Sequence, residues 1–307
     1  MAESTAQFTT HLPNDVLARV ERMRLNPLRR KTNHSRGEHL SGKGGTSTEF
    51  ADYRDYTPGD DVRYVDWNIF ARINHPYLKL YKHEEEMHIV LLVDASRSMQ
   101  FEGKFDLARQ LAAAFGVMGL FNVERVSAYS CRERSEEPVI FPPCTGRASL
   151  RRLLRFLEDL PGGGEFPIEA AIEEALKRHR GKGVCVLLSD FLTLGDMTRS
   201  FNLLHSAGLE IFALQILGPT ELDPELTGDL RFVDSETEQT LDVSSVGELL
   251  GLYHEHREAL ANHLAALCRK RQGRFLTVSS GEDVKNVLFD RLLRRVGAVM
   301  VDARGWE

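Results

Sequence analysis

Stretches typical of strands and of helices alternate from residue 88 onwards. The apolar run at 88–93 is too short to cross a membrane and predicts a central parallel strand covered by helices on both faces. Further strands are predicted at 125–131, 139–141, 184–188, 209–216, 230–233, 240–243 and 274–278. Helices are predicted at 104–121, 147–160, 168–179, 197–207, 246–271 and 284–295. This alternation predicts an α/β fold with a doubly wound, mostly parallel, Rossmann-like sheet flanked by helices.

The first 87 residues have a different pattern. Apolar positions at helical spacing between Pro13 and Arg24 predict an amphipathic helix that packs on the main domain. A polar, glycine-rich stretch follows, and a Pro-Gly turn then separates short strands predicted at 62–67 and 77–81. We therefore predict an N-terminal helix with a basic linker (1–34), a segment of loops and short strands (35–87) and an α/β domain (88–307).

Charged side chains of both signs gather in the second of these parts. Because arginine forms bidentate bonds with carboxylates, we interpret them as ion pairs that fix this loop-rich segment on the domain, with a recognition surface as the alternative. The residues concerned are Arg54, Asp60, Asp61, Arg63, Asp66 and Arg72.

Composition narrows the class of protein. The chain is 42% hydrophobic with a net charge of −6, which favours a globular protein and argues against nucleic acid as a partner. Its four cysteines form no C-x-x-C pair, so neither a disulfide framework nor a zinc site is predicted. The sequence lacks a signal-peptide pattern, and its longest apolar run, 111–121, is too short for a membrane span. We expect a cytoplasmic protein without a membrane span.

One apparent nucleotide-binding motif is discounted. Gly37, Gly42 and Lys43 fit most of a P-loop pattern, but Gly44 stands where a serine or threonine should bind Mg²⁺. No apolar strand precedes this stretch and no helical pattern follows it, so ATP binding is not predicted.

Polar side chains at predicted strand ends carry the candidate chemistry. Asp94, Ser96 and Ser98 follow the strand at 88–93, and Asp190 follows the strand at 184–188. The carboxyl ends of parallel strands share one edge of a sheet, so these residues can meet there. Carboxylate and hydroxyl oxygens suit a small divalent cation such as Mg²⁺ or Mn²⁺. The alternative is that Asp94 and the two serines only shape a turn and cap the following helix.

Two motifs resemble known families. Residues 94–98, Asp-Ala-Ser-Arg-Ser, resemble the metal ion-dependent adhesion site of a von Willebrand factor type A domain. The block at 53–63, together with Asp66-Trp67 and Ala71-Arg72, resembles the signature of the bacterial domain of unknown function 58 family. The resemblance covers residues 35–290 and implies a MoxR-type AAA+ ATPase as a partner.

The adhesion-site resemblance also implies roles for individual residues. Ser96 and Ser98 would bind the metal through their hydroxyls, and Asp94 and Asp190 would hold it directly or through water. The chain departs from the pattern in the third loop, where Gly164 replaces the expected threonine and Glu165 follows. Either the site is weak or empty, or Glu165 substitutes as a ligand.

These features lead to three hypotheses of function. The first is a non-enzymatic adaptor that binds a protein through its metal site and acts with the AAA+ ATPase in protein remodelling or maturation. The second is a Mg²⁺-dependent hydrolase or phosphotransfer enzyme with Asp94 as nucleophile. The third is a structural module whose metal site is vestigial.

Overall fold

The computed structural model describes residues 8–28, 50–81, 87–131, 137–193, 195–224, 230–233, 240–243 and 246–301. The chain forms two compact units, a larger one of Met1–Arg29 with Met87–Glu307 and a smaller one of Arg30–Glu86. The P-loop-like stretch at 37–44 lies outside the described residues. In the described ranges, no helix combines the length and the apolar character that crossing a bilayer requires.

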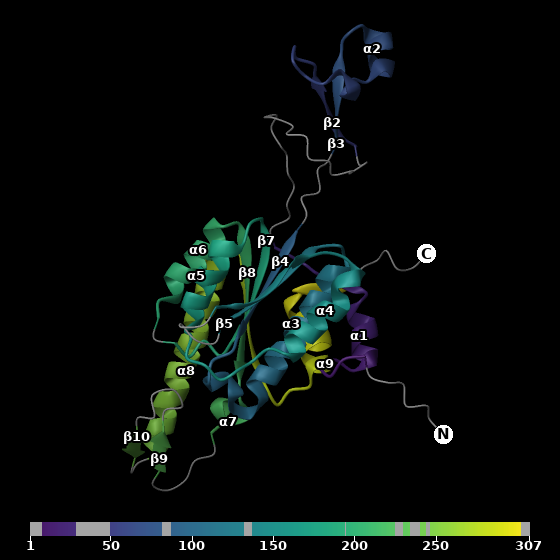
Figure 1. The fold of residues 1–307 in the computed structure, drawn as a ribbon. Coiled ribbons are helices and arrows are strands. Elements are labelled where there is room, and N and C mark those ends of the chain that lie inside the picture. The colour runs from purple at the N-terminus through teal and green to yellow at the C-terminus, as the bar shows by residue number, and fades with distance from the viewer. Residues whose placement is uncertain are drawn as a thin grey trace, which may run out of the picture. The chain divides into compact units, whose positions relative to one another are not determined.

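A six-stranded sheet organises the larger unit, with the strand order β11-β8-β7-β4-β5-β6 (Figure 1). The bounds are β4 His88–Asp94, β5 Arg125–Cys131, β6 Val139–Cys144, β7 Gly183–Ser189, β8 Leu209–Leu217 and β11 Arg274–Ser279. Every pairing is parallel except the antiparallel pairing of β6 with β5. The predicted doubly wound, mostly parallel sheet is thus confirmed, with β4 near its centre.

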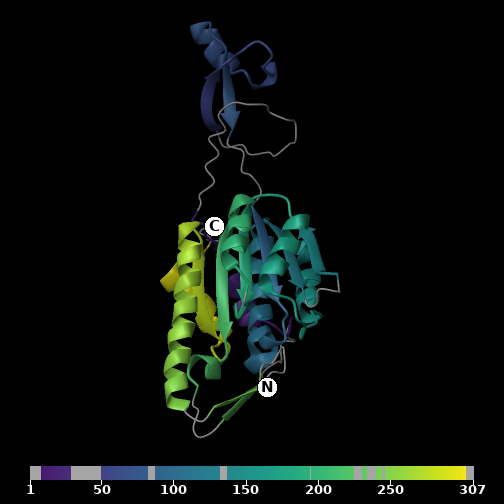
Figure 2. The same cartoon turned by 90° about the vertical axis from the view of Figure 1, so that its left-hand side faces the viewer.

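Helices cover both faces of this sheet. The bounds are α1 Asn14–Val20, α3 Lys104–Phe121, α4 Leu150–Glu158, α5 Ile168–Arg178, α6 Met197–Ser206, α7 Pro219–Leu222, α8 Val246–Lys270 and α9 Val284–Asn286, which continues as the π-helix η4 Val287–Val296. Helices α1, α3, α4 and α9 lie on one side, whereas α5, α6 and α8 lie on the other (Figure 1). Figure 2 shows α8, the longest helix in yellow-green, running along the sheet.

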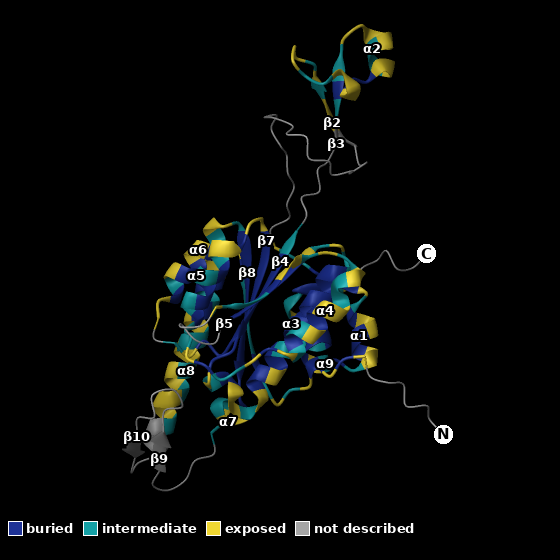
Figure 3. Cartoon of the chain, viewed as in Figure 1, coloured by how far each residue is buried: buried dark blue, intermediate teal, exposed yellow. Residues whose placement is uncertain are grey.

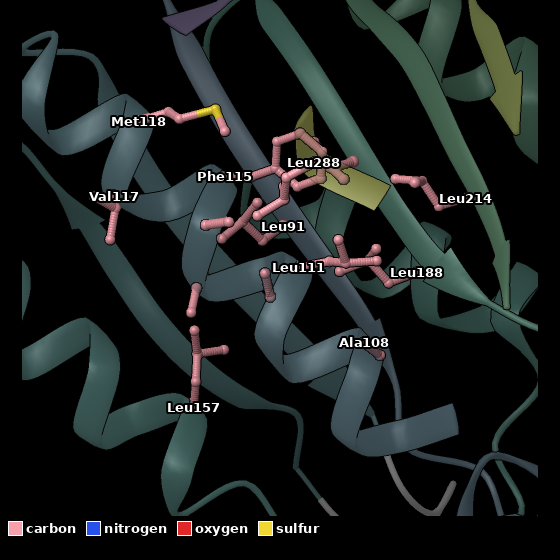
Figure 4. Close-up of a cluster of buried hydrophobic side chains, with 14 of the residues drawn as sticks. Leu91, Ala108, Leu111, Phe115, Val117, Met118, Leu157, Leu188, Leu214 and Leu288 are labelled. Carbon is pink, nitrogen blue, oxygen red and sulfur yellow. The ribbon is translucent and has the colours of Figure 1, made fainter. Parts of the chain in front are cut away.

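Two hydrophobic cores follow from the alternation of side chains along the strands. Ile89, Leu91 and Val93 of β4 belong to the core under α3, whereas Val90 and Leu92 belong to the core under α5 and α6. The central strands are accordingly buried over their length, as the dark blue in Figure 3 shows. In the first core, side chains from β4, α3 and the π-helix meet around Leu91, Phe115 and Leu288 (Figure 4). These two cores fix the strand ends that carry the candidate site.

Short elements complete the larger unit. The first helix, α1, buries Val16, Leu17 and Val20 in the core under α3, as its apolar spacing predicts. Strand β1 (Met23–Leu25) pairs with β12 (Val299–Val301), and β9 (Leu230–Val233) pairs with β10 (Thr240–Val243), both antiparallel. The 3-10 turns η2 (Ser98–Gly103) and η3 (Arg147–Ser149) lead into α3 and α4.

The smaller unit consists of β2 (Phe50–Asp55), η1 (Val62–Tyr64), α2 (Trp67–Ile73) and β3 (Tyr77–Tyr81). Strand β3 is confirmed and pairs antiparallel with β2. The strand predicted at 62–67 is wrong, because the chain forms η1 and the start of α2 there. The carboxylate of Asp61 accepts a bond from the Arg63 N–H, and that of Asp66 accepts bonds from the first N–H groups of α2.

Ion pairs do form among the charged residues of the smaller unit. Arg54 lies 2.7 Å from Asp60, and Arg63 lies 2.6 Å from Asp61. Asp66, which begins α2, is also 3.0 Å from Lys79 of β3. These three ion pairs join residues of the smaller unit to one another, so they do not bear on the prediction that the charges fix this segment on the domain.

Candidate functional site

The loop that leaves β4 turns sharply at Asp94. This carboxylate is 6% exposed and accepts a hydrogen bond from the backbone N–H of Ser96 at 2.9 Å. Its second oxygen accepts a 2.5 Å bond from the hydroxyl of Ser189, the last residue of β7. Asp94 therefore ties its own loop to the end of the neighbouring strand.

Two hydroxyls stand next to this carboxylate. The Oγ atoms of Ser96 and Ser98 lie 3.0 Å apart, and either can donate to the other. Ser96 is 7% exposed, whereas Ser98 is partly exposed. The pattern Asp-x-Ser-x-Ser thus produces one carboxylate and two adjacent hydroxyls, the hard oxygen set that the sequence predicts for a small divalent cation.

The glycine-rich loop between α4 and α5 lies against the β4 loop through main-chain atoms. The N–H groups of Gly163 and Gly164 donate to the carbonyl of Ala95 at 2.9 and 3.2 Å, and the N–H of Arg97 donates to the Gly164 carbonyl at 2.7 Å. The φ angle of Gly163 is +93°, which side chains disfavour. Glycine is therefore favoured at position 163 of this loop.

Glu165 follows that loop and points into solvent. Its side chain is 59% exposed, and one of its oxygens lies 3.9 Å from Arg97. Gly164 has no hydroxyl to offer. The glycine-rich loop contacts Ser96 through its backbone, in an isolated parallel β-bridge between Ser96 and Gly164.

The end of β7 places the second carboxylate. Asp190 is 2% exposed, and one oxygen accepts the N–H of Leu192 at 3.1 Å. Phe191 adopts a φ angle of +56°, which is rare for a residue with a large side chain, and its ring is 1% exposed. Its buried ring holds this unusual turn in place.

A buried lysine, which our sequence reasoning missed, completes the cluster. The ammonium of Lys104, the first residue of α3, lies 2.9 Å from Asp190 and 2.7 Å from Glu221 of α7. Its side chain is 0% exposed. Burial alone would lower the pKa of Lys104, but the two carboxylates raise it above its ordinary value, so the ammonium stays charged.

The charges of the two aspartates interact. Burial raises the pKa of Asp94 from 3.8 to about 6, and the nearby charge of Asp190 contributes to this rise. Among the described residues, no cationic side chain lies within salt-bridge distance of Asp94. The candidate site thus contains one carboxylate with a lysine counter-ion and one without.

Four of the five predicted site residues, Asp94, Ser96, Ser98 and Asp190, come together at one edge of the sheet. The described residues contain no cluster of three or more His, Cys, Asp or Glu side chains that could hold a metal. A metal here would therefore depend on the serine hydroxyls and on water. That donor set fits Mg²⁺ and Mn²⁺, which keep water ligands in protein sites.

The sheet order and the polar loops at its carboxyl edge define a doubly wound α/β fold. The chain belongs to the family described as "Protein of unknown function DUF58", whose profile matches residues 52–261. Among curated relatives, uncharacterized proteins of Mycobacterium tuberculosis and Mycobacterium bovis are each 30% identical over 208 residues. This match spans 66% of the chain and 65% of each relative.

Among solved structures, the chain is similar to the conserved hypothetical protein BatB from Bacteroides thetaiotaomicron. The identity is 13% and the TM-score 0.37, over 63% of this chain and 90% of that one. It is also similar to a von Willebrand factor type A protein from Catenulispora acidiphila, with 14% identity and a TM-score of 0.35, over 46% of this chain and 34% of that one.

Proposed function

We propose that this protein is a non-enzymatic binding module that recognises an acidic side chain of a protein partner through a bound Mg²⁺ or Mn²⁺ ion. The observation that carries the proposal is the pair of serine hydroxyls 3.0 Å apart beside the buried carboxylate of Asp94. These are hard oxygen donors at the carboxyl edge of a parallel sheet, where ligands of such folds bind.

Asp94, Ser96 and Ser98 would hold the ion, and Asp190 would contribute through water. When bound, the ion supplies a positive charge that a partner's carboxylate can approach. The chain's own contribution is to fix the donors before binding. The Asp94 carboxylate is held by two hydrogen bonds, and the β4 loop is held by the main chain of the glycine-rich loop. Such preorganisation lowers the entropic cost of binding.

The proposed partner is a MoxR-type AAA+ ATPase, with a role in remodelling or maturing other proteins. The proposal of this partner rests on the signature block at residues 53–63, whose resemblance to the domain of unknown function 58 family implies it. Binding through an ion at the edge of the sheet requires no catalytic base or nucleophile, so the proposed module does not catalyse a reaction itself.

Calorimetry tests the metal site. We expect wild-type protein to bind Mg²⁺ or Mn²⁺, and Asp94→Asn, which keeps the shape but not the charge of the side chain, to weaken binding about 100-fold or more. The control is Asp159→Asn, which removes an exposed carboxylate at the end of α4 and should leave affinity unchanged. Equal affinity in wild type and Asp94→Asn would refute the site.

A pull-down with a MoxR-type ATPase tests the partner. Because the ATPase itself needs Mg²⁺, the decisive comparison is between wild type and Asp94→Asn in the same magnesium buffer, with chelator as a third condition. We expect capture by wild type alone. Capture that is unaffected by Asp94→Asn would show that the partner binds elsewhere.

A purely structural role for the strand ends is the second candidate. It is favoured by one observation, namely that both oxygens of Asp94 already accept hydrogen bonds from Ser96 and Ser189. On this view the carboxylate links two loops and binds no ion. Absence of any Mg²⁺ or Mn²⁺ heat in the wild type would favour it.

A screen with generic phosphatase substrates tests the enzyme hypothesis, under which Asp94→Asn would abolish turnover.

A further inference from the structure

Lys104 is the most deeply buried charge in the described part of the chain. It begins α3, directly after Gly103, whose φ angle is +72°. The ammonium lies 2.9 Å from the Oδ2 atom of Asp190 and 2.7 Å from the Oε1 atom of Glu221. A buried ammonium is costly unless it is paired and hydrogen-bonded. Lys104 and the two carboxylates therefore hold one another in position.

The second carboxylate is itself held in place. The Oε2 atom of Glu221 accepts the N–H of Gly218 at 2.6 Å, and the hydroxyl of Tyr253 in α8 donates to the backbone carbonyl of Glu221 at 2.6 Å. Glu221 is 18% exposed, so part of it contacts solvent while Lys104 does not. The ammonium therefore stands between the candidate metal site on one side and α7 on the other.

Both oxygens of Asp190 are engaged. Leu192 donates its N–H to Oδ1, and Lys104 donates to Oδ2. A divalent cation that used Asp190 as a direct ligand would compete with the ammonium for the carboxylate and would be repelled by its charge. Asp94 has no such competitor, because the hydrogen bonds that it accepts from Ser96 and Ser189 come from neutral groups.

We infer that Lys104 is the residue that sets the metal affinity of this site, by reserving Asp190 as its own counter-ion and leaving Asp94 as the charged ligand. This inference rests on the proposed metal site. Lys104 acts through Asp190 and is thus a positioning residue. Glu221 moderates the effect, because it neutralises part of the charge of the ammonium.

The arrangement has a consequence for the partner. An ion held by one carboxylate keeps more of its positive charge than an ion held by two, and it attracts a partner's carboxylate more strongly. Lys104 would thus weaken the binding of the ion alone and strengthen the binding of an acidic partner to the loaded site.

Two substitutions with opposite expected effects test the inference by calorimetry with Mg²⁺ and Mn²⁺. Lys104→Met removes the competing charge and should tighten metal binding about tenfold or more. Glu221→Gln leaves Lys104 on Asp190 with less of its charge neutralised, and it should weaken metal binding about two- to fivefold. If Lys104 only supported the fold, both substitutions would weaken binding.

A third variant guards against misfolding. Lys104→Met with Glu221→Gln removes the ammonium and the charge of Glu221 together, and should still bind metal more tightly than wild type. Circular dichroism and the denaturation midpoint of each variant identify those that fold. Affinities of Lys104→Met and of the double variant at or below that of wild type would overturn the inference.

Failure of the inference is distinguishable from failure of the proposed function. If wild type binds Mg²⁺ in an Asp94-dependent manner and the Lys104 variants bind no more tightly, only the inference fails. If wild type binds no metal but the Lys104 variants do, the inference stands and the proposed function fails. If none of these proteins binds metal, both fail.

Discussion

Asp94 ends β4 and Asp190 directly follows the neighbouring strand β7, and yet the two carboxylates differ in their surroundings. Both are buried, at 6% and 2% exposure. Asp190 has a buried ammonium 2.9 Å away, whereas Asp94 is bonded by an N–H and a hydroxyl. The pKa of Asp94 is accordingly raised to about 6, through burial and through the charge of Asp190.

The difference shows that a pair of acidic residues at adjacent strand ends need not act as a symmetric pair. One carboxylate already has its cation within the protein. The other has a charged form that is disfavoured until a cation arrives, since burial without a counter-ion penalises ionisation.

Removal of the lysine should have the largest effect on stability. Lys104→Met leaves Asp190 and Glu221 without their counter-ion, and loss of one partner of a buried pair typically costs about 3–5 kcal/mol. Urea denaturation in chelator at pH 7.5 measures this loss. The matched control is Lys177→Met, which removes an exposed lysine paired with Glu174 and should cost less than about 1 kcal/mol. Equal costs at the two positions would contradict the comparison.

The raised pKa of Asp94 should be visible as a dependence of stability on pH. The folded chain binds this proton more tightly than the unfolded chain does, so the contribution is present at pH 4 and is lost as the pH rises through 6. A rise from 3.8 to about 6 corresponds to roughly 3 kcal/mol.

Because many groups titrate in this range, the quantity to measure is a difference. Asp94→Asn cannot ionise, so its free energy of unfolding in chelator should gain on that of wild type between pH 4 and 7. A gap between the two proteins that stays constant over this range would show that Asp94 is not perturbed.

Loss of either serine hydroxyl should have a smaller effect, and on metal affinity rather than on the fold. Ser96→Ala and Ser98→Ala each remove one proposed neutral ligand, and we expect Mg²⁺ affinity to fall roughly tenfold in each. Ser149→Ala, at the end of the exposed turn before α4, is the control. An unchanged Mg²⁺ affinity in both site variants would show that neither hydroxyl is a ligand of the ion.

Glu165 should matter least. Its side chain is 59% exposed and 3.9 Å from Arg97, so solvent and salt screen its charge. We expect Glu165→Ala to change Mg²⁺ affinity less than about twofold in calorimetry. A drop of tenfold or more would instead make Glu165 the missing third ligand, as one of the two sequence alternatives has it.

The sequence predicted the parts of this site that depend on local pattern. Apolar runs that end in Asp94 and Asp190 identified the two strand ends, and the parallel sheet brought them together. Lys104 could not be assigned in this way. Its partners lie 86 and 117 residues away, and a lysine at the start of a helix looks like any solvated charge until the fold buries it.

Two of the predicted strands differ from those in the structure. Tyr, Val and Trp residues favoured a strand at 62–67, but Asp61 and Asp66 bond to backbone N–H groups there and begin helical turns instead. The strand at 139–141 was expected to stop before Pro142, yet β6 continues to Cys144. It lies at the edge of the sheet, where proline is tolerated because one side of the strand needs no partner.

The contact between the β4 loop and the glycine-rich loop separates the holding of the site from its chemistry. The loops meet through the carbonyls and N–H groups of residues 95, 97, 163 and 164, so their contact uses no side chain from either loop. This contact is thus made with glycine, and without a hydroxyl, at position 164. The main chain therefore holds the β4 loop in place independently of the side chains that this loop would offer to an ion.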